Sequence, residues 1–468
     1  DSHSKGTADS DPSVIQMLGP SSLLSLSGIF FDILPEADTQ SCSDTDPIVY
    51  EPEGNIHSPE SFAPLLKKLV ADPAAFSLAD TRLAFNHLAE HDGAHPSQIG
   101  AFLAALRLTG KDGQPEIVAE CAKVMQDHAR KVDIQQHGDG PVCDIVGTGG
   151  DGHNTFNVST TAAIVAAGAG LRVYKVCLWG PRFSLSSSLA TRHLTGLVFP
   201  LPRLQHGNKA ATSSSGSADI LLSLGCPVTT LPPAALSHVA AQSPFLFLFA
   251  PLYHPAMVRV APVRKQLGFP TVFNALGPLI NPAKPKAVIV GVHSKYLGPI
   301  FAEALKITGV ERAWVVCGAE GLDEISPAGE TFVRSPFAAC GMLPCTDRQS
   351  FVIPKIWDLK DGTITERTIN PTVFGLDPTP LSTVAGGTPL ENSLTLLNLL
   401  DNKLSTSNPI ENFVVLNAAA LLLVAGQARD EKHGVELARE SLRSGKAKEA
   451  IESFRKASTE YAKTHPLQ

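Results

Sequence analysis

The chain has 468 residues, of which 43% are hydrophobic and 18% charged, so it can build an apolar core and is not globally disordered. Its 38 basic and 45 acidic side chains give a formal net charge of −7, which argues against a protein that binds nucleic acid through a large basic face. No apolar run reaches the roughly 18 residues that a bilayer requires, so we expect no membrane span.

The N-terminal part of the chain is predicted to be a loose tail followed by helices. Residues 1–55 are rich in Ser, Asp, Pro and Thr, and we expect them to form a poorly ordered tail. Apolar residues then recur at helical spacing, which predicts a small all-helical domain over residues 56–135. The four predicted helices start near Ser58, at Ser77 or Asp80, at Ser97 (Ile99–Leu108, stopped by Gly110) and at Glu116 (ending at Val132).

The pattern changes near Val142, where short apolar strands begin to alternate with helices. This alternation predicts an α/β domain over residues 140–468 with a mostly parallel central sheet. The predicted strands are Cys143–Val146, Leu171–Tyr174, Val272–Phe273, Ala287–Val292 and Ala313–Cys317, and the predicted helices are Ala162–Gly170, Glu411–Ala425 and Glu431–Tyr461.

The eight cysteines are dispersed and form no CxxC pair, which indicates neither a zinc ribbon nor a redox dithiol. We expect reduced, mostly buried thiols. Residues 1–50 hold no basic segment followed by a long apolar stretch. We therefore expect no secretory signal and a cytoplasmic protein.

The strongest motif is a glycine-rich segment that follows the first predicted strand. The sequence DIVGTGGDG, residues 144–152, is followed by NTFNVST, residues 154–160. Glycines let the backbone approach an anion closely, and N–H groups at a turn and a helix start point at phosphate. An ordinary glycine turn with a Ser/Thr cap is the alternative. We favour a phosphate site because several polar residues are added to the glycines, namely Asp151, Asn157, Ser159 and Thr160.

Four further segments carry candidate polar groups, each with a plainer alternative. His206–Lys209 with Ser213–Asp219 combines hydroxyls, an amide and a cation, although a solvated linker has the same composition. Arg264 can clamp a carboxylate or serve as a surface or capping residue, and the nearby His254 can be a buried structural histidine. The apolar loop Thr271–Pro282 can wall a pocket. Asp323 and Glu324 follow a predicted strand and suit Mg²⁺ shared with phosphates, or form a charged turn.

Taken in order, these motifs resemble those of the anthranilate phosphoribosyltransferases, in their fungal form. The matching strings are GTGGD, NVST, HGN, SGSAD, HPAM, VAPVR, FNALGPLINP and GLDEIS, and the resemblance covers about residues 58–460. It implies a nucleoside-phosphorylase-like phosphoribosyltransferase fold, in which a small helical domain, with further helices from about residues 230–265, packs on a large α/β domain. It also implies a homodimer through the small domain.

The resemblance further implies an activity and a set of site residues. The family transfers phosphoribosyl from phosphoribosyl pyrophosphate to the amine of anthranilate and releases pyrophosphate, in tryptophan biosynthesis. An aromatic amine is neutral at pH 7 and is itself the nucleophile, so we assign no catalytic acid or base. The implied ligands of phosphoribosyl pyrophosphate are Gly147, Gly149, Gly150, Asp151, Asn157, Ser159, Thr160, Lys175 and Ser213; those of anthranilate are His206, Asn208, His254, Arg264, Gly277 and Pro278; those of Mg²⁺ are Ser159, Asp323 and Glu324.

One segment departs from the family pattern, in which the strand-ending lysine is followed at once by His-Gly-Asn. Here Val176–Gln205, 30 residues without an acidic side chain, separate Lys175 from His206. Removing them restores the pattern, and the codons for Val-Cys and Gln permit intron-like ends. We therefore favour a translated, unspliced intron over a family-specific surface insertion. Because a displacement of about 1 Å can cost on the order of a hundredfold in rate, we expect weak or absent activity from the chain as written.

Two other functions remain open at this point. A pyrimidine nucleoside phosphorylase shares the fold and a glycine-rich phosphate loop, but the paired carboxylates Asp323 and Glu324 fit Mg²⁺ and pyrophosphate better. A non-catalytic relative that binds nucleic acid would need a basic groove, which the acidic balance disfavours.

Overall fold

The computed structural model describes residues 57–132, 134, 140–177, 215–328 and 355–465. The tail expected over residues 1–55 and most of the insertion expected over 176–205 lie outside this part of the chain. Within it, no helix is both long enough and apolar enough to cross a bilayer.

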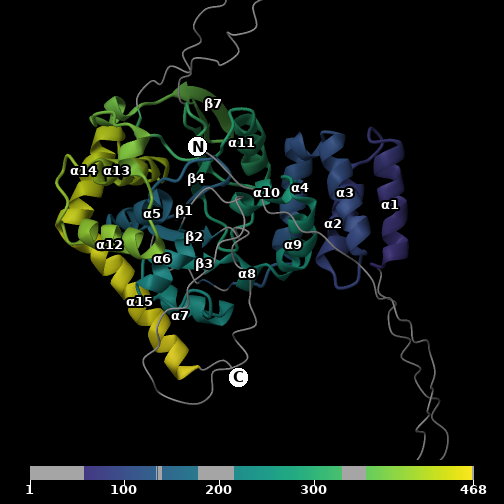
Figure 1. The fold of residues 1–468 in the computed structure, drawn as a ribbon, viewed down its shortest axis with the longest axis horizontal. Helices are drawn as coiled ribbons and strands as arrows, with labels where there is room; N and C mark the ends of the chain where they lie inside the picture. The colour runs from purple at the N-terminus through teal and green to yellow at the C-terminus, as the bar shows by residue number, and fades with distance from the viewer. Residues whose placement is uncertain (1–56, 133, 135–139, 178–214, 329–354, 466–468) are drawn as a thin grey trace, which may run out of the picture. The chain divides into compact units, whose positions relative to one another are not determined.

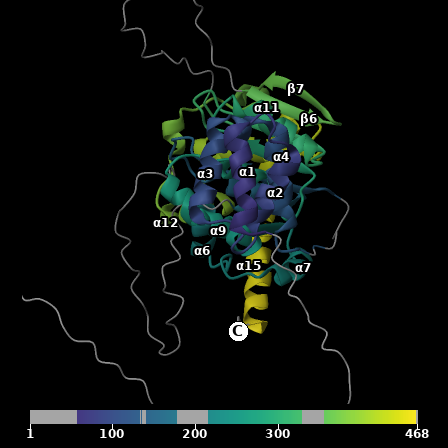
Figure 2. The same cartoon turned by 90° about the vertical axis from the view of Figure 1, so that its right-hand side faces the viewer.

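Four helices form a bundle at the start of the described chain and lie side by side (Figure 2). Ser58 and Ser77 cap the first two through capping boxes, as their sequence positions predicted. The third helix begins at Pro96 rather than after Ser97, because Pro suits the first helical position and Gln98 accepts from the N–H of His95 at 2.8 Å. The bounds are α1 Pro59–Ala71, α2 Leu78–Ala89, α3 Pro96–Leu108 and α4 Pro115–Asp127, with the short η1 Lys111–Gly113 before α4.

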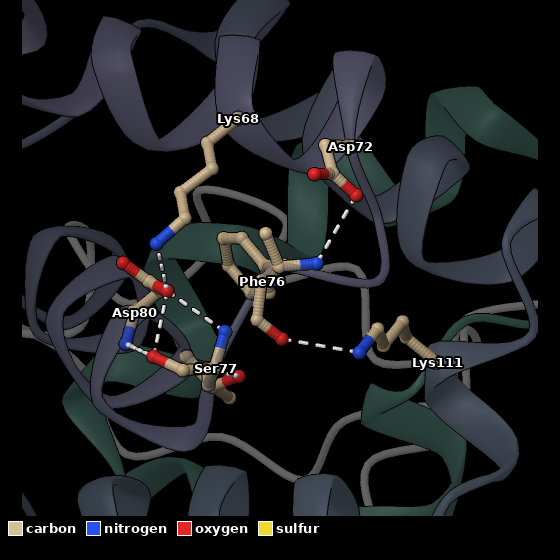
Figure 3. A network of polar contacts seen from close by, with 8 residues as sticks. Lys68, Asp72, Phe76, Ser77, Asp80 and Lys111 are labelled. Carbon is tan, nitrogen blue, oxygen red and sulfur yellow. Dashed lines mark hydrogen bonds and ion pairs between the residues drawn. The ribbon is translucent and has the colours of Figure 1, made fainter.

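A polar network holds the connection between α1 and α2 (Figure 3). Asp80 accepts from the ammonium of Lys68 at 2.7 Å and from both the hydroxyl and the N–H of Ser77, at 2.6 and 2.7 Å. Lys111 donates to the carbonyl of Phe76 at 3.1 Å, and Asp72 accepts from the N–H of Ala75. These bonds satisfy backbone groups that the turn leaves without helical partners.

A seven-stranded sheet, counted over the described residues, forms the second part of the fold. Its order is β3-β2-β1-β4-β5-β6-β7, and the first five strands are parallel while β6 and β7 are antiparallel. The mostly parallel sheet predicted from the sequence is therefore confirmed. The bounds are β1 Val142–Gly147, β2 Arg172–Cys177, β3 Phe245–Phe249, β4 Ala287–Gly291, β5 Arg312–Cys317, β6 Lys355–Lys360 and β7 Thr363–Thr368.

Helices cover both faces of the sheet, on opposite sides of it in Figure 1. One core joins the sheet to the mostly C-terminal helices α5 Val158–Gly168, α13 Pro409–Val424, α14 Glu431–Arg443 and α15 Lys446–Thr464. The other joins it to α9 Pro255–Leu267, α11 Leu297–Ile307 and the bundle, through contacts of α9 with α2 and α3 and of α11 with α4. The remaining elements are α6 Ser217–Ser223, η3 Pro233–Ala235, α7 Leu236–Ala240, α8 Ala250–Tyr253, α10 Phe273–Leu276, η4 Gly277–Leu279, η6 Pro371–Phe374, η7 Leu381–Val384 and α12 Pro389–Leu400.

Three predicted elements were wrong in type or extent. Val272–Phe273 is no strand, because the Asn274 side chain accepts from the N–H of Thr271 at 3.0 Å and starts the helical turn α10. The helix predicted to reach Val132 ends at Asp127. The predicted C-terminal helix is two helices, because Gly445 has a φ of 78° and interrupts the helical backbone between them.

Candidate active site

The glycine-rich segment forms a turn at the carboxyl end of β1, the central strand of the parallel part of the sheet. Gly149, Gly150 and Gly152 have φ values of 73°, 83° and 84°, a region that side chains other than glycine's rarely adopt. Gly147 and Gly291 pair across β1 and β4, and a Cβ on either would collide with Asp323. The two glycines therefore make the space that brings a carboxylate against the turn.

The first turn of α5 lies next in the chain. Asn157 is its N-cap: the side-chain oxygen accepts from the N–H of Thr160 at 3.3 Å, and the amide nitrogen donates to the hydroxyl of Ser217 at 3.3 Å. The buried Thr160 hydroxyl has no hydrogen-bond partner among the described residues. Ser159 bonds to Glu324. A capped helix start that also carries an unpaired hydroxyl group, that of Thr160, can receive a phosphate oxygen.

Asp323 and Glu324 lie in the loop that follows β5, where the sequence placed them. Asp323 accepts from the N–H of Gly149 at 2.5 Å. Burial, together with the negative charge of Asp151, raises the pKa of Asp323 to about 7, and burial beside Asp323 raises the pKa of Glu324 well above its usual range. Two carboxyl groups whose charge is disfavoured in this way suit a divalent cation, which would restore their ionised form.

No three His, Cys, Asp or Glu side chains within the described ranges gather into a group that could hold a metal alone. The donors at the turn are the carboxylates of Asp323 and Glu324, with that of Asp151 beside them, and the Ser159 hydroxyl. This set fits Mg²⁺, which commonly takes one or two carboxylates and completes its coordination with water and substrate phosphates. It does not resemble the closed sites of zinc.

Lys175 is buried near the same carboxylates. It lies on β2, is 2% exposed, and its ammonium donates to the carbonyl of Ile145 on β1. Its positive charge counters the burial effect on the pKa of both Asp144 and Glu324. Lys175 thus supplies a buried cation between the glycine turn and the carboxylate loop.

The residues expected to bind anthranilate lie on and beside α9. His254 is buried against the backbone of Met125 and Ile280, and burial lowers its pKa to about 4, so its ring is neutral at pH 7. Arg264, in the last turn of α9, donates to Asn274 at 3.4 Å and lies over the ring of Phe273, and burial lowers its pKa to about 10. The expected channel residues Gly277 and Pro278 are buried in η4.

The segment Thr271–Asn281 connects the two groups of residues. Its Asn274 bonds to Arg264, its Ile280 lies against His254, and its Asn281 donates to Asp144 on β1 at 2.7 Å. His206, Asn208 and Ser213 lie outside the described residues, so the structure does not report on them.

Sequence reasoning missed four residues that the geometry brings to this site, namely Asp144, Asn274, Asn281 and Gly291. A usable signal existed for some of them. Asp144 and Asn281 are polar residues inside otherwise apolar stretches, and Gly291 ends an apolar strand as Gly147 does. None of these signals predicts which distant residue each of the four contacts.

Two family models match the chain. The glycosyl transferase family, a/b domain, matches residues 139–188, 200–336 and 349–448, and the glycosyl transferase family, helical bundle domain, matches residues 63–129. The anthranilate phosphoribosyltransferase of Schizosaccharomyces pombe is 41% identical over 361 residues, which are 77% of this chain and 87% of that protein. The chain belongs to the anthranilate phosphoribosyltransferase family. It is therefore an enzyme of the glycosyltransferase class that acts in tryptophan biosynthesis.

Further relatives in the anthranilate phosphoribosyltransferase family agree in sequence and fold. The protein of Phenylobacterium zucineum is 36% identical, over 84% of this chain and 97% of its own. The Saccharomyces cerevisiae enzyme, solved in complex with PRPP and Mg, superposes with a TM-score of 0.68 at 31% identity and covers 86% of this chain and 99% of its own. Another structure of the yeast enzyme is a complex with 4-fluoroanthranilate, at 30% identity and the same TM-score and coverage.

Proposed function

We propose that this chain transfers the phosphoribosyl group of phosphoribosyl pyrophosphate to the amine of anthranilate, giving N-(5-phosphoribosyl)anthranilate and pyrophosphate. The observation that carries the proposal is the meeting of three features at one end of the sheet: the glycine turn after β1, the start of α5 and the buried pair Asp323 and Glu324. Such a place is suited to a pyrophosphate held with a divalent cation.

In this mechanism the chain binds and orients both substrates. The N–H groups of Gly150 and Gly152 in the turn and the unpaired hydroxyl of Thr160 at the α5 start, with Lys175, would bind phosphate oxygens. Asp323, Glu324 and Ser159 would hold Mg²⁺. When bound, Mg²⁺ neutralises charge on the departing pyrophosphate. Arg264 faces the carboxylate of anthranilate, and the neutral His254 packs beside the ring and does not act as a general acid. The amine attacks the ribosyl carbon as the bond from that carbon to pyrophosphate breaks, and the proton that the amine loses passes to solvent. Positioning and electrostatics therefore account for catalysis.

The test is the loss of anthranilate fluorescence on adding phosphoribosyl pyrophosphate and Mg²⁺. The proposal expects a loss that requires all three components, slow in the chain as written and faster once Val176–Gln205 is removed. Phosphate-dependent cleavage of a pyrimidine nucleoside, with no anthranilate turnover, would instead support the nucleoside phosphorylase alternative. Retention on DNA that weakens with salt would support the nucleic-acid-binding alternative.

We also propose that the insertion weakens the enzyme. In the structure β2 continues through Val176 and Cys177, which pair with Leu248 and Phe249 on β3. Val176 is fully buried and its N–H donates to Asp144 at 3.4 Å. The position directly after Lys175 is therefore filled by Val176, whereas the family pattern requires His206 there. This supports an impaired anthranilate site in the chain as written.

We further propose a homodimer formed through the helical bundle. Leu108 and Val70 are 87% and 63% exposed on α3 and α1, two helices of the bundle that contact each other, and a patch of exposed apolar side chains is a feature of interaction surfaces. Light scattering of the purified chain should give twice the monomer mass, and Leu108→Glu should lower it.

Within the described residues the cysteines Cys121, Cys143, Cys226 and Cys317 are buried and unpaired, which supports a reducing, cytoplasmic location.

A further inference from the structure

The pairing of the two strands β1 and β2 stops early. They are in register only at Val142 with Arg172 and at Cys143 with Val173. On the far sides the ladders run on, between β1 and β4 as far as Gly147 and between β2 and β3 as far as Cys177. The sheet therefore opens between β1 and β2 toward the carboxyl ends of its strands, where the candidate site lies.

Beyond the last paired residues of β1 and β2, two buried side chains make hydrogen bonds to the backbone of the strands. Asn281 donates to the carbonyl of Tyr174 and to the carboxylate of Asp144, both at 2.7 Å. The same carboxylate accepts from the N–H of Val176 at 3.4 Å and, through its other oxygen, from the N–H of Ile145 at 2.8 Å. Asp144 and Asn281 are each 1% exposed, so these bonds lie away from solvent competition.

The residue between these two anchored peptide groups is Lys175. The Tyr174 carbonyl lies on its N-terminal side and the Val176 N–H on its C-terminal side, so both adjoining peptide groups are held. Its ammonium then crosses the opening to the carbonyl of Ile145, which is the residue next to Asp144. The backbone of Lys175 and the end of its side chain are thus both fixed by one polar network.

We propose that Asp144 and Asn281 are positioning residues that hold Lys175 toward the phosphate-binding turn across the opening between β1 and β2. The proposal rests on the proposed function, in which Lys175 binds phosphoribosyl pyrophosphate. Neither residue touches substrate. They replace the missing strand pairing with side-chain bonds, and this leaves room for the lysine side chain while its backbone stays fixed.

The test is a double-mutant cycle on the full chain, read by calorimetric titration with phosphoribosyl pyrophosphate in Mg²⁺ buffer. Asn281→Ala leaves the Tyr174 carbonyl without its side-chain donor and the Asp144 oxygen with only the longer bond from Val176, and should weaken binding about tenfold or more. In a Lys175→Met background the same substitution should change the dissociation constant less than about twofold, because the residue through which Asn281 acts is already lost.

A matched control separates positioning from stability. Ser441→Ala removes another buried side-chain bond, to the carbonyl of Val165 at 2.7 Å in the C-terminal half of α5. It should lower the melting temperature without changing the dissociation constant. If Asn281→Ala does not fold, Asp144→Asn serves instead. It replaces one of two accepting oxygens by an amide that cannot accept from Asn281, Val176 or Ile145, and should weaken binding in the same direction.

Two results would overturn the inference while leaving the proposed function intact. One is unchanged binding in the Asn281→Ala and Asp144→Asn variants, and the other is an equal loss with and without Lys175, which would indicate a purely structural role. If the unsubstituted chain fails to bind phosphoribosyl pyrophosphate, the proposed function itself fails and the inference falls with it.

Discussion

The carboxylate of Asp323 accepts a hydrogen bond from the backbone N–H of Gly149 at 2.5 Å. The two residues are 174 positions apart in the chain, yet this bond joins the turn after β1 to the loop after β5. Gly147 leaves room for the Asp323 carboxylate and Gly291 leaves room for the Asp323 backbone, so the carboxylate can lie against the turn. The bond is thus the link between the expected phosphate-binding and cation-binding parts of the site.

Adding a methyl group at Gly147, next to the Asp323 carboxylate, should lower the stability of the protein and weaken the binding of phosphoribosyl pyrophosphate. Gly147→Ala places a Cβ against the Asp323 carboxylate, and overpacking of this kind costs about 1–3 kcal/mol. We expect a lower free energy of unfolding in urea and weaker binding of phosphoribosyl pyrophosphate. Gly113→Ala in η1, where the nearest atom is 4.0 Å from the new Cβ, is the control and should stay within about 0.5 kcal/mol. Equal behaviour of the two variants would contradict the close approach.

Removing the charge of Asp323 should change the dependence on Mg²⁺. Asp323→Asn keeps an oxygen that can accept from Gly149 but loses the charge that attracts a cation. We expect the Mg²⁺ concentration needed for half-maximal binding of phosphoribosyl pyrophosphate to rise about tenfold or more. Asp358→Asn on β6 is the control, since that carboxylate pairs with Arg367 and not with the turn. An unchanged Mg²⁺ dependence would remove Asp323 from the cation site.

The buried His254 should make the protein sensitive to mild acid. Its pKa is about 4 in the folded chain, below the ordinary 6.5, so between these values the unfolded chain binds a proton that the folded chain does not. The stability that the neutral ring contributes is therefore complete above pH 6.5 and is lost as the pH falls toward 4, by roughly 3 kcal/mol.

His254→Gln should flatten that pH dependence, measured as urea unfolding at a series of pH values from 4 to 7. Substitution of the exposed His238 by Gln is the control and should leave the slope as it is. If His254→Gln retains the full acid sensitivity, other buried groups cause it.

Deleting Val176–Gln205 should raise the activity. The deletion puts His206 directly after Lys175, and its backbone N–H can take the bond to Asp144 that Val176 now makes. We expect a large gain in the steady-state rate of anthranilate consumption. A deletion of 178–205 only, which leaves Val176 and Cys177 in β2, is the matched control and should recover less. Equal activity of the full chain and the first deletion would contradict the proposed impairment, and mature transcripts that all retain the 90 nucleotides would exclude the intron.

In the network between α1 and α2, the N-cap of α2 should contribute more to the free energy of unfolding than the ion pair does. Ser77→Ala removes the N-cap bonds of α2 and should cost about 0.5–2 kcal/mol of unfolding free energy. Lys68→Met removes a cation whose side chain is 42% exposed and should cost less than about 1 kcal/mol. Urea unfolding of both variants at low and high salt checks the order. A larger loss for Lys68→Met would reverse this assignment.

Local signals in the sequence were reliable where a few neighbouring residues decide the structure. The starts at Ser58 and Ser77 follow from side chains that bond to N–H groups three residues on, and Gly110 adopts a φ of 69° after α3 as its position predicted. Val272–Phe273 was misassigned because two apolar residues fit a strand or a helix equally, and the Asn274 bond decided between them.

The antiparallel pair β6 and β7 was not predicted, for a physical reason. β7 is largely exposed and holds Thr, Glu and Arg, so it has no apolar alternation for a pattern to detect. It forms because β6 pairs with β5, the last strand of the parallel part of the sheet, and that pairing depends on a sheet already assembled. Similarly, Phe245–Phe249 is a short apolar run that fits a strand or a buried helix, and its place beside β2 follows from the sheet order.

The sequence by itself determined the family, the alternation of strands and helices, and the residue types of the site, since these depend on short motifs and on local bonding. Only the tertiary structure decided which distant residues meet. Asp323 reaches Gly149 because two glycines on adjacent strands leave it room, and Asn281 reaches Asp144 because the β1 and β2 ladder ends early. Such contacts arise from packing between segments far apart in the chain, and no pattern within one segment encodes the partner.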